Sequence, residues 1–401
     1  MPGGGGLARA AVLDDPAQVE AADPGGMLRQ VASSAAQVRS SLLATQETGL
    51  RDVLAEGRPR AVVVAGTGAA GLAGDLLAAV CGPGCPVQII TVRGYQLPGW
   101  VSVADLVFAV SGAGSVSGAG SGAGTDEETL SAATDAGRRG CRLVAVGAPE
   151  SGLRAVAEQA RAPFVPVRAT GLARAMLWGL AVPLIATAAR LGLCDAGTDA
   201  FEAAAAVLED VSQRCRPDLE SFVNPGKELA LDLAGTLPVI WGSSPLAAVA
   251  AHRFASQLSE NAKYPALHGA LPEAGRSQLA VFDGRFAPGP SVPWTPGLDG
   301  LGGPAGLDGG ADEPREVPLR LVMLADTHED PRLTARRGTC VRIAAERGAD
   351  VTELAAAGDH PLLRLASLVQ LTDYATVYLG IALGLDPSAS PHSQDQTART
   401  T

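Results

Sequence analysis

Short β-branched runs, each followed by a glycine-rich turn and a helix, constrain this chain more than any other feature. Ala61–Ala65 (AVVVA) precedes residues 66–75 (GTGAAGLAGD) and a helical segment. Further apolar runs follow at 87–92, 104–110, 141–147 and 164–167. Strands that are apolar throughout and alternate with helices are typical of a parallel sheet covered on both faces. The first half is therefore predicted to be an α/β layer structure.

The pattern recurs later in the chain. Residues 237–241 (LPVIW) precede Gly242-Ser243-Ser244 and a helical segment that runs to Leu258. A chain of 401 residues is also too long for one typical core. We therefore expect an N-terminal tail and helical preface at 1–55, α/β domains at 56–195 and 196–386, a Gly/Pro-rich insertion at 285–318, and a polar tail at 387–401.

Charge and apolar patterning exclude several classes of partner. The formal net charge is -11, and Lys227 and Lys263 are the two lysines of the chain. Nucleic acid and anionic membranes are therefore not expected as partners. Residues 1–10 lack the features of a signal peptide, and no apolar run reaches membrane-spanning length. A cytoplasmic protein with reduced thiols is expected, and its six scattered cysteines do not suggest a zinc site.

Glu260 is the candidate for acid–base chemistry. It lies in residues 258–278 (LSENAKYPALHGALPEAGRSQ) and follows a helical run whose apolar residues recur at three- and four-residue steps. A carboxylate held against apolar packing can have a raised pKa, which suits a general base. Spacing alone also allows Glu260 and Lys263 to be an ordinary solvated pair at a helix end.

The glycine-rich turn after the first strand allows two interpretations. Gly66, Gly68 and Gly71 match the spacing of a dinucleotide-binding turn, but the second strand ends in Arg93-Gly94 without the acidic residue that such a site uses. Close packing of strand and helix explains the glycines as well. The turn also places backbone N–H groups and a helix N-terminus where they can hold a phosphate or a polar sugar edge.

The box SENAKYPA, followed by LPEAGRSQLAVFDG, resembles the NENAK...PELNHNE signature of the bifunctional phosphoglucose/phosphomannose isomerases, a branch of the sugar isomerase (SIS) domain family. The resemblance extends over about residues 14–386. It implies two SIS-like three-layer α/β/α subdomains with parallel sheets and a helical N-terminal preface. It also implies a homodimer that converts glucose 6-phosphate or mannose 6-phosphate to fructose 6-phosphate through a cis-enediolate, with no metal or nucleotide cofactor.

The resemblance assigns two catalytic residues. Glu260 would move the proton between C2 and C1 of the phosphorylated hexose. Arg174, in a segment similar to the family's GxxxRAALG, would stabilise the enediolate charge. A purely local role at a helix start is the alternative for Arg174.

Substrate-binding residues are also implied. Gly66 and Gly68 lie in a turn similar to the family's GMGGSAIGGD, whose serine falls at Ala70. Residues 111–130 (SGAGSVSGAGSGAGTDEETL) resemble a longer form of SxSGxTEET, and Ser388 lies in a segment similar to DPT. The register of the Ser/Gly tract is open: one alignment uses Ser121, Ala123 and Asp126, a shift by one residue restores Thr125, and Ser111 is a further option. The residues predicted to bind substrate are Gly66, Gly68, Ser121, Thr125, Thr129 and Ser388.

Two positions depart from the family pattern. Arg276 occupies the place of the ring-opening histidine, with His268 eight residues earlier, and no lysine follows Lys263 where the family has one near its C-terminus. Guanidinium does not exchange protons as imidazole does. The sequence therefore predicts a slow isomerase, with a non-catalytic sugar-phosphate-binding SIS module, acting as sensor or scaffold, as the alternative.

Overall fold

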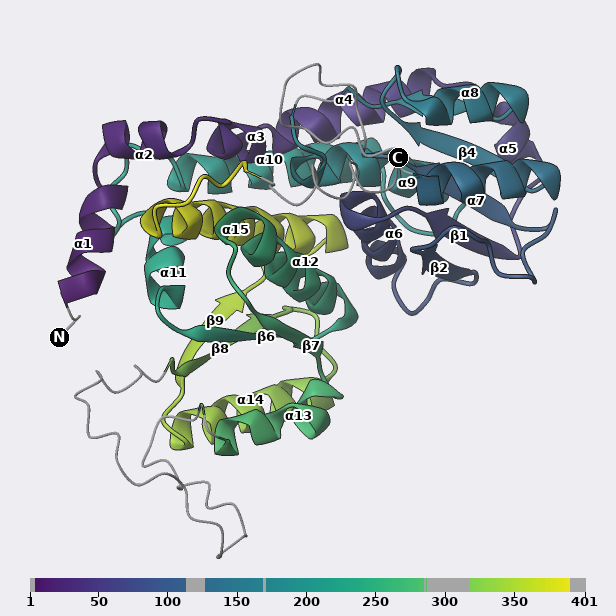
Figure 1. Cartoon of the computed structure of the whole chain (residues 1–401). Helices are drawn as coiled ribbons and strands as arrows, with labels where there is room; N and C mark the ends of the chain where they lie inside the picture. Colours follow the sequence, from purple (N-terminus) through teal and green to yellow (C-terminus); the bar gives the residue numbers. More distant parts are fainter. Residues whose placement is uncertain (1–3, 113–126, 169–170, 285, 287–316, 390–401) are drawn as a thin grey trace, which may run out of the picture.

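The computed structural model describes residues 4–112, 127–168, 171–284, 286 and 317–389, and shows two parallel sheets enclosed by helices (Figure 1). Most of the expected 285–318 insertion and of the expected polar tail lies outside the described residues. The predicted α/β fold with two parallel sheets is confirmed. No helix in the described ranges is long and apolar enough to cross a membrane.

The first sheet has the strand order β2-β1-β3-β4-β5, and every neighbouring pair is parallel. Its strands are β1 (Ala61–Ala65), β2 (Gln88–Val92), β3 (Leu106–Val110), β4 (Arg142–Gly147) and β5 (Phe164–Pro166). The helices around it are α5 (Arg51–Ala55), α6 (Gly68–Cys81), α7 (Glu127–Arg138), α8 (Gly152–Gln159) and α9 (Leu177–Arg190). Side chains alternate between two cores: Val62 and Val64 face α6 and α9, whereas Val63 and Ala65 face α7 and α8.

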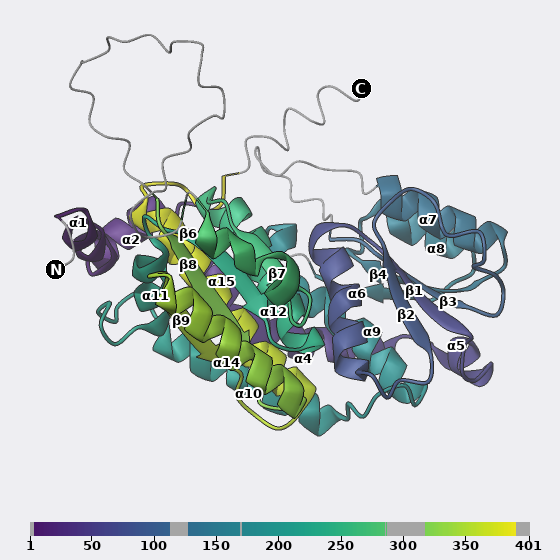
Figure 2. The same ribbon diagram turned by 90° about the horizontal axis from the view of Figure 1, so that it is seen from below.

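The second sheet has the order β7-β6-β8-β9 and is also parallel. Its strands are β6 (Leu237–Gly242), β7 (Leu267–Ala270), β8 (Leu319–Ala325) and β9 (Asp350–Ala355). One face is covered by α11 (Pro225–Leu233), α12 (Pro245–Ala262) and α15 (Pro361–Ala382), and the other by α13 (Ala274–Ser277), the 3-10 turn η2 (Leu279–Asp283) and α14 (Pro331–Glu346) (Figure 2).

One continuous apolar core joins the two sheets. It contains Val62 of the first sheet, Ile240 and Val322 of the second, and residues of α6, α9, α12 and α15 between them. The approach of α12 to its sheet is close, since a Cβ at Gly242 would lie 2.2 Å from the Ala248 nitrogen. Burial of this core is the main term that holds the halves together.

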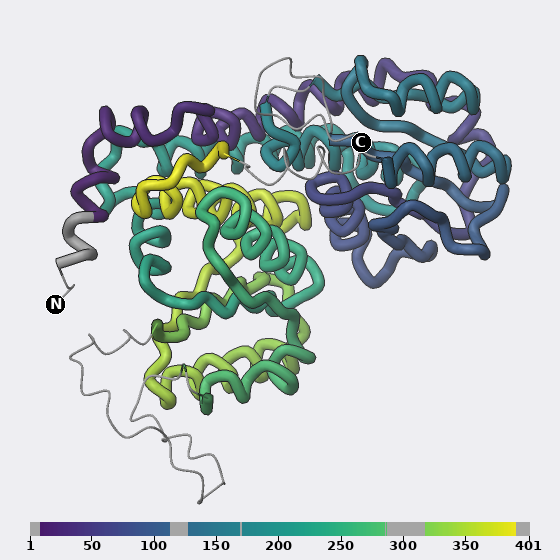
Figure 3. Tube along the Cα trace, in the orientation of Figure 1, coloured from purple at the N-terminus to yellow at the C-terminus, as the bar shows by residue number. Residues whose placement is uncertain are grey.

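The N-terminal helices run along one side of the molecule from the second sheet toward the first (Figure 3). They are α1 (Gly4–Leu13), α2 (Pro16–Ala22), α3 (Met27–Ala32) and α4 (Ser34–Glu47). α3 contacts α15, whereas α4 packs on α9 and on α10 (Thr198–Arg214). The preface therefore contacts both halves of the molecule.

Four elements differ from expectation at their ends or in their existence. α6 begins at Gly68, inside the glycine-rich turn. The apolar pattern of the sequence predicts a helix over 341–348, whereas α14 begins ten residues earlier, where Asp330 caps it and Pro331 starts it. α1 forms in a segment expected to be a tail. The sequence around His268 favours a turn, whereas the structure forms the edge strand β7 there.

Candidate functional site

The C-terminal end of α12 positions Glu260. Ser244 caps the N-terminus of this helix and Pro245 starts it, at the carboxyl end of β6. Lys263 ends it in a left-handed conformation with φ of 52°. The Lys263 Nζ donates to the Glu260 carbonyl at 3.1 Å and to the Asp386 carbonyl at 2.9 Å. The helix end and the 386–388 segment are therefore held together.

Arg174 joins three segments that are far apart in sequence. It lies in the 3-10 turn η1 (Ala173–Ala175) and is 8% exposed. Its Nε donates to Asn261 Oδ1 at 3.0 Å, and its Nη2 donates to the carbonyls of Pro387 at 2.7 Å and Ser388 at 3.0 Å. The guanidinium is thus fixed against the end of α12.

Glu260 and Arg174 form the predicted pair. Their Oε2 and Nε atoms lie 3.8 Å apart. Partial burial raises the pKa of Glu260, although the cations of Arg174 and Arg253 oppose this effect. The side chain nevertheless remains 43% exposed, so a ligand can reach it. The carboxylate is a stronger proton acceptor than a fully solvated glutamate.

The glycine turn lies at the carboxyl edge of the first sheet. A Cβ at Gly66 would meet the Val110 carbonyl oxygen at 3.0 Å, so the end of β1 closely approaches the end of β3. Gly68 has a φ of 53° and starts α6. A Cβ at Gly112 would lie 3.1 Å from the Ala173 Cβ. The ends of β1 and β3 therefore lie beside the turn that carries Arg174.

The predicted hydroxyl ligands of the phosphate have different positions. Thr129 is 1% exposed and lies in the first turn of α7, where its Oγ1 donates to the Val110 carbonyl at 3.3 Å. It joins α7 to the end of β3. Ser121 and Thr125 lie outside the described residues, as do Ala123 and Asp126.

Ser388 contributes its main chain to the site. Its hydroxyl donates to Asp386 Oδ1 at 2.5 Å, while its carbonyl accepts from Arg174. A Cβ at Gly25 would lie 2.2 Å from the Ser388 Oγ, so the N-terminal preface packs directly on this segment. The three predicted positions Arg174, Glu260 and Ser388 therefore belong to one cluster.

In the structure of the single chain, Arg276 and His268 do not belong to this cluster. Arg276 is in α13, on the face of the second sheet opposite to α12 (Figure 1). His268 is in β7, where its ring stacks on His252 with centroids 4.7 Å apart. His252 Nδ1 lies 3.8 Å from Asp75 Oδ2 of α6.

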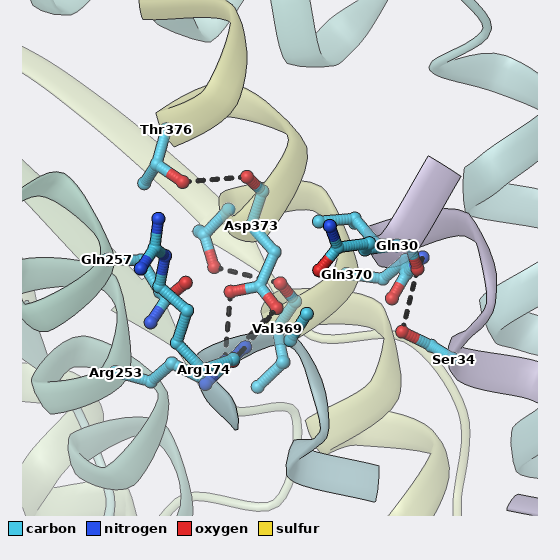
Figure 4. A network of polar contacts seen from close by, with 12 residues as sticks. Gln30, Ser34, Arg174, Arg253, Gln257, Val369, Gln370, Asp373 and Thr376 are labelled. Carbon is cyan, nitrogen blue, oxygen red and sulfur yellow. Dashed lines mark hydrogen bonds and ion pairs between the residues drawn. The ribbon is translucent and has the colours of Figure 1, made fainter. Parts of the chain in front are cut away.

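A buried ion pair beside the cluster was not among the predicted site residues. Arg253 of α12 donates to Asp373 of α15 through Nε at 2.9 and 3.1 Å and through Nη2 at 2.6 Å (Figure 4). The same Nη2 donates to the Arg174 carbonyl at 3.0 Å. The sequence carries a signal for this pair. Arg253 and Asp373 are charged residues surrounded by the buried residues of α12 and α15, and buried charges are normally paired.

The chain is similar in sequence to known proteins over most of its length. Residues 222–395 match the family described as the bacterial phospho-glucose isomerase C-terminal SIS domain. A bifunctional phosphoglucose/phosphomannose isomerase from Caldicellulosiruptor bescii is 27% identical over 329 residues, covering 82% of this chain and 85% of that protein. A protein of the same name from Aquifex aeolicus is 28% identical over 180 residues, covering 45% of this chain and 47% of that protein.

A solved structure shows the same architecture. The C-terminal domain of glucosamine-fructose-6-phosphate aminotransferase from Francisella tularensis superposes with a TM-score of 0.61 at 14% identity, covering 90% of this chain and 97% of that domain. The sequence resemblance is thus confirmed: the chain is similar to bifunctional phosphoglucose/phosphomannose isomerases over most of its length, and residues 222–395 match the bacterial phospho-glucose isomerase C-terminal SIS domain.

Proposed function

We propose that this protein is an aldose–ketose isomerase that converts glucose 6-phosphate or mannose 6-phosphate to fructose 6-phosphate. The names of its relatives support a sugar-phosphate isomerase. The observation that carries the specific reaction is the pairing of Glu260, whose pKa is raised by partial burial, with Arg174 at 3.8 Å. A base beside a fixed cation is what proton abstraction next to a carbonyl requires.

In the proposed mechanism, Glu260 takes the proton from C2 of the open-chain aldose and the electron pair moves into a cis-enediolate. The Arg174 guanidinium stabilises the negative charge on the enediolate oxygens. Glu260 then returns the proton to C1, while the hydroxyl proton moves from O2 to O1, which yields the ketose. Because C2 is oxidised by the same two electrons that reduce C1, the isomerisation needs no external oxidant or reductant.

The carboxyl edge of the first sheet is the proposed phosphate side of the site. Gly66 follows the end of β1 there, Gly68 starts α6, and Thr129 lies in the first turn of α7. Helix N-termini attract anions because their backbone N–H groups and dipoles point outward. Ser121, Thr125 and Ser388 are the proposed hydroxyl contacts to the substrate.

Turnover provides the test. Purified protein at high concentration should form fructose 6-phosphate from glucose 6-phosphate or mannose 6-phosphate, and should exchange the C2 proton with D₂O. We expect slow turnover, because Arg276 replaces the ring-opening histidine and general acid catalysis contributes about 10²–10⁴-fold. Absence of both product and exchange would refute the proposal.

The same two departures favour a second candidate, a sugar-phosphate-binding module that senses or scaffolds. Arg276 and the lack of a lysine after Lys263 both remove proton-handling groups of the family pattern. Thermal unfolding with a panel of sugar phosphates distinguishes the candidates. Stabilisation without turnover would indicate a sensor, whereas no stabilisation by any sugar phosphate would indicate a scaffold.

A further inference from the structure

We propose that Arg253 and Asp373 form a positioning pair that fixes the main chain of Arg174 against α12 and thereby aligns Arg174 with Glu260. This inference rests on the proposed isomerase function, which it deepens. Neither residue touches the substrate in this proposal. They act through Arg174, whose backbone they hold.

The pair has the contacts that this role requires. The Arg253 and Asp373 side chains are 2% and 4% exposed, and they connect α12 to α15. The Arg253 Nη2 contacts both Asp373 Oδ2 and the Arg174 carbonyl oxygen, at 2.6 and 3.0 Å (Figure 4). One guanidinium therefore links two long helices to the short turn η1. Because η1 spans only three residues, this external bond restricts its orientation.

The position of Arg253 on α12 connects the pair to the proposed base. Seven residues separate Arg253 from Glu260, so two helical turns place them on nearly the same face. Between them, Gln257 accepts from the amide of Asn261, which in turn accepts from Arg174. Both charges also act on the Glu260 carboxyl: Arg253 lowers its pKa and Asp373 raises it. The pair is therefore coupled to Glu260 electrostatically as well as through these contacts.

Stability alone is a weak reason for such a pair. A buried ion pair must overcome the loss of hydration of two charges, and an apolar pair of similar volume is often at least as stable. Within the described residues, the buried Arg253 Nη1 has no hydrogen-bond partner, which adds to that cost. The two charges are better explained by the geometry that they impose on Arg174.

The decisive variant replaces the pair by apolar residues, as Arg253→Met with Asp373→Leu in the full-length protein. The matched control is Arg364→Met with Asp326→Leu. That pair also involves α15, with Nε and Oδ1 2.8 Å apart and side chains 10% and 4% exposed, but it makes no contact with Arg174 or Glu260 among the described residues. Cooperative unfolding and near-ultraviolet circular dichroism confirm that each variant is folded.

We expect the Arg253/Asp373 double variant to lose about 10- to 100-fold in kcat with KM within about threefold, because small misplacements of catalytic groups cost that much. The control should keep kcat within about threefold of wild type. A kcat near wild type in the Arg253/Asp373 variant, or equal losses in both double variants, would overturn the inference. If the double variant does not fold, Arg253→Lys serves instead, since lysine retains the charge but cannot reproduce the planar fork. Arg253→Lys should then show the same loss of kcat, and a wild-type kcat would count against positioning.

A second readout separates this inference from the proposed function. The Glu260 carboxyl carbon can be assigned by ¹³C NMR through its absence in Glu260→Gln and then titrated. Its pKa should rise in the Arg253/Asp373 variant, because Arg174 is no longer held beside it, and should stay unchanged in the control. If the wild type shows no turnover, the isomerase proposal fails while this titration still decides the positioning role. An unchanged titration would reject that role.

Discussion

Replacing Arg174 by methionine removes a fixed cation while keeping much of the aliphatic side chain. The substitution breaks the bonds to Asn261 and to the carbonyls of Pro387 and Ser388. Water can reach part of this region, so we expect the free energy of unfolding to fall by about 2–4 kcal/mol rather than by the sum of three charge-assisted bonds. The protein should remain folded at 25 °C.

The catalytic loss follows from the charge. At the 3.8 Å between Arg174 Nε and Glu260 Oε2, two unit charges interact by ~4 kcal/mol at an effective dielectric constant of ~20 and by ~1 kcal/mol in water. Solvent screening at the 43% exposed Glu260 favours a value of about 2 kcal/mol before substrate binds. An enediolate formed after substrate has displaced that water should gain about 3–4 kcal/mol from the same cation. We therefore expect kcat to fall about 10²–10³-fold.

Steady-state isomerisation of hexose 6-phosphate measures this loss, with Arg174→Lys as the comparison. Lysine keeps the charge but not the planar arrangement of donors, so its kcat should lie between those of wild type and Arg174→Met. The acidic limb of the kcat profile should also move to higher pH in Arg174→Met, because the pKa of Glu260 rises when the cation is lost. An Arg174→Met variant whose kcat stays within about threefold of wild type would refute the electrostatic role.

Three further predictions follow from the site and its support. Glu260→Gln should lower kcat about 10²–10⁴-fold at nearly unchanged stability, measured by turnover and by C2 proton exchange, and a fully active variant would exclude Glu260 as the base. In wild type, kcat should decrease as the pH falls through the pKa of Glu260, because the base must be deprotonated, and this limb should lie above the ordinary glutamate value and disappear in Glu260→Gln. Gly242→Ala should lower the free energy of unfolding, measured in urea, by about 3 kcal/mol, because the new Cβ would overlap the α12 backbone. Gly99→Ala is the control: the space around Gly99 is open, so the free energy of unfolding should change by less than ~1 kcal/mol.

The strands of both sheets could be located from sequence where they are buried on both faces. β1 and β3 are continuous apolar runs, and β8 is interrupted by Arg320 alone; this pattern is typical of such strands. β7 escaped prediction because an edge strand with a glycine in it lacks that pattern. The start of α6 was also missed, since glycines in the turn have low helix propensity although the first turn of a helix accepts them.

The site was only partly accessible from sequence. The family resemblance implied that Arg174 and Glu260 act at one site. No local sequence pattern could show this, because the two residues are far apart in the chain. The Arg253–Asp373 bond spans 120 residues, and only the burial of both helices reveals it. The bond from the Thr129 hydroxyl to the Val110 carbonyl also joins residues 19 apart in sequence, and no local pattern indicates it.

α12 begins at the carboxyl end of a second-sheet strand and ends with its proposed base beside the first sheet. Its 18 residues form a rod of about 27 Å that carries Glu260 across the boundary between the halves. The proton acceptor and the proposed phosphate side are thus contributed by different halves of the polypeptide. Cutting the chain between α9 and α11 should leave two fragments that are each inactive, and activity should return only when the fragments associate and rebuild their shared apolar core.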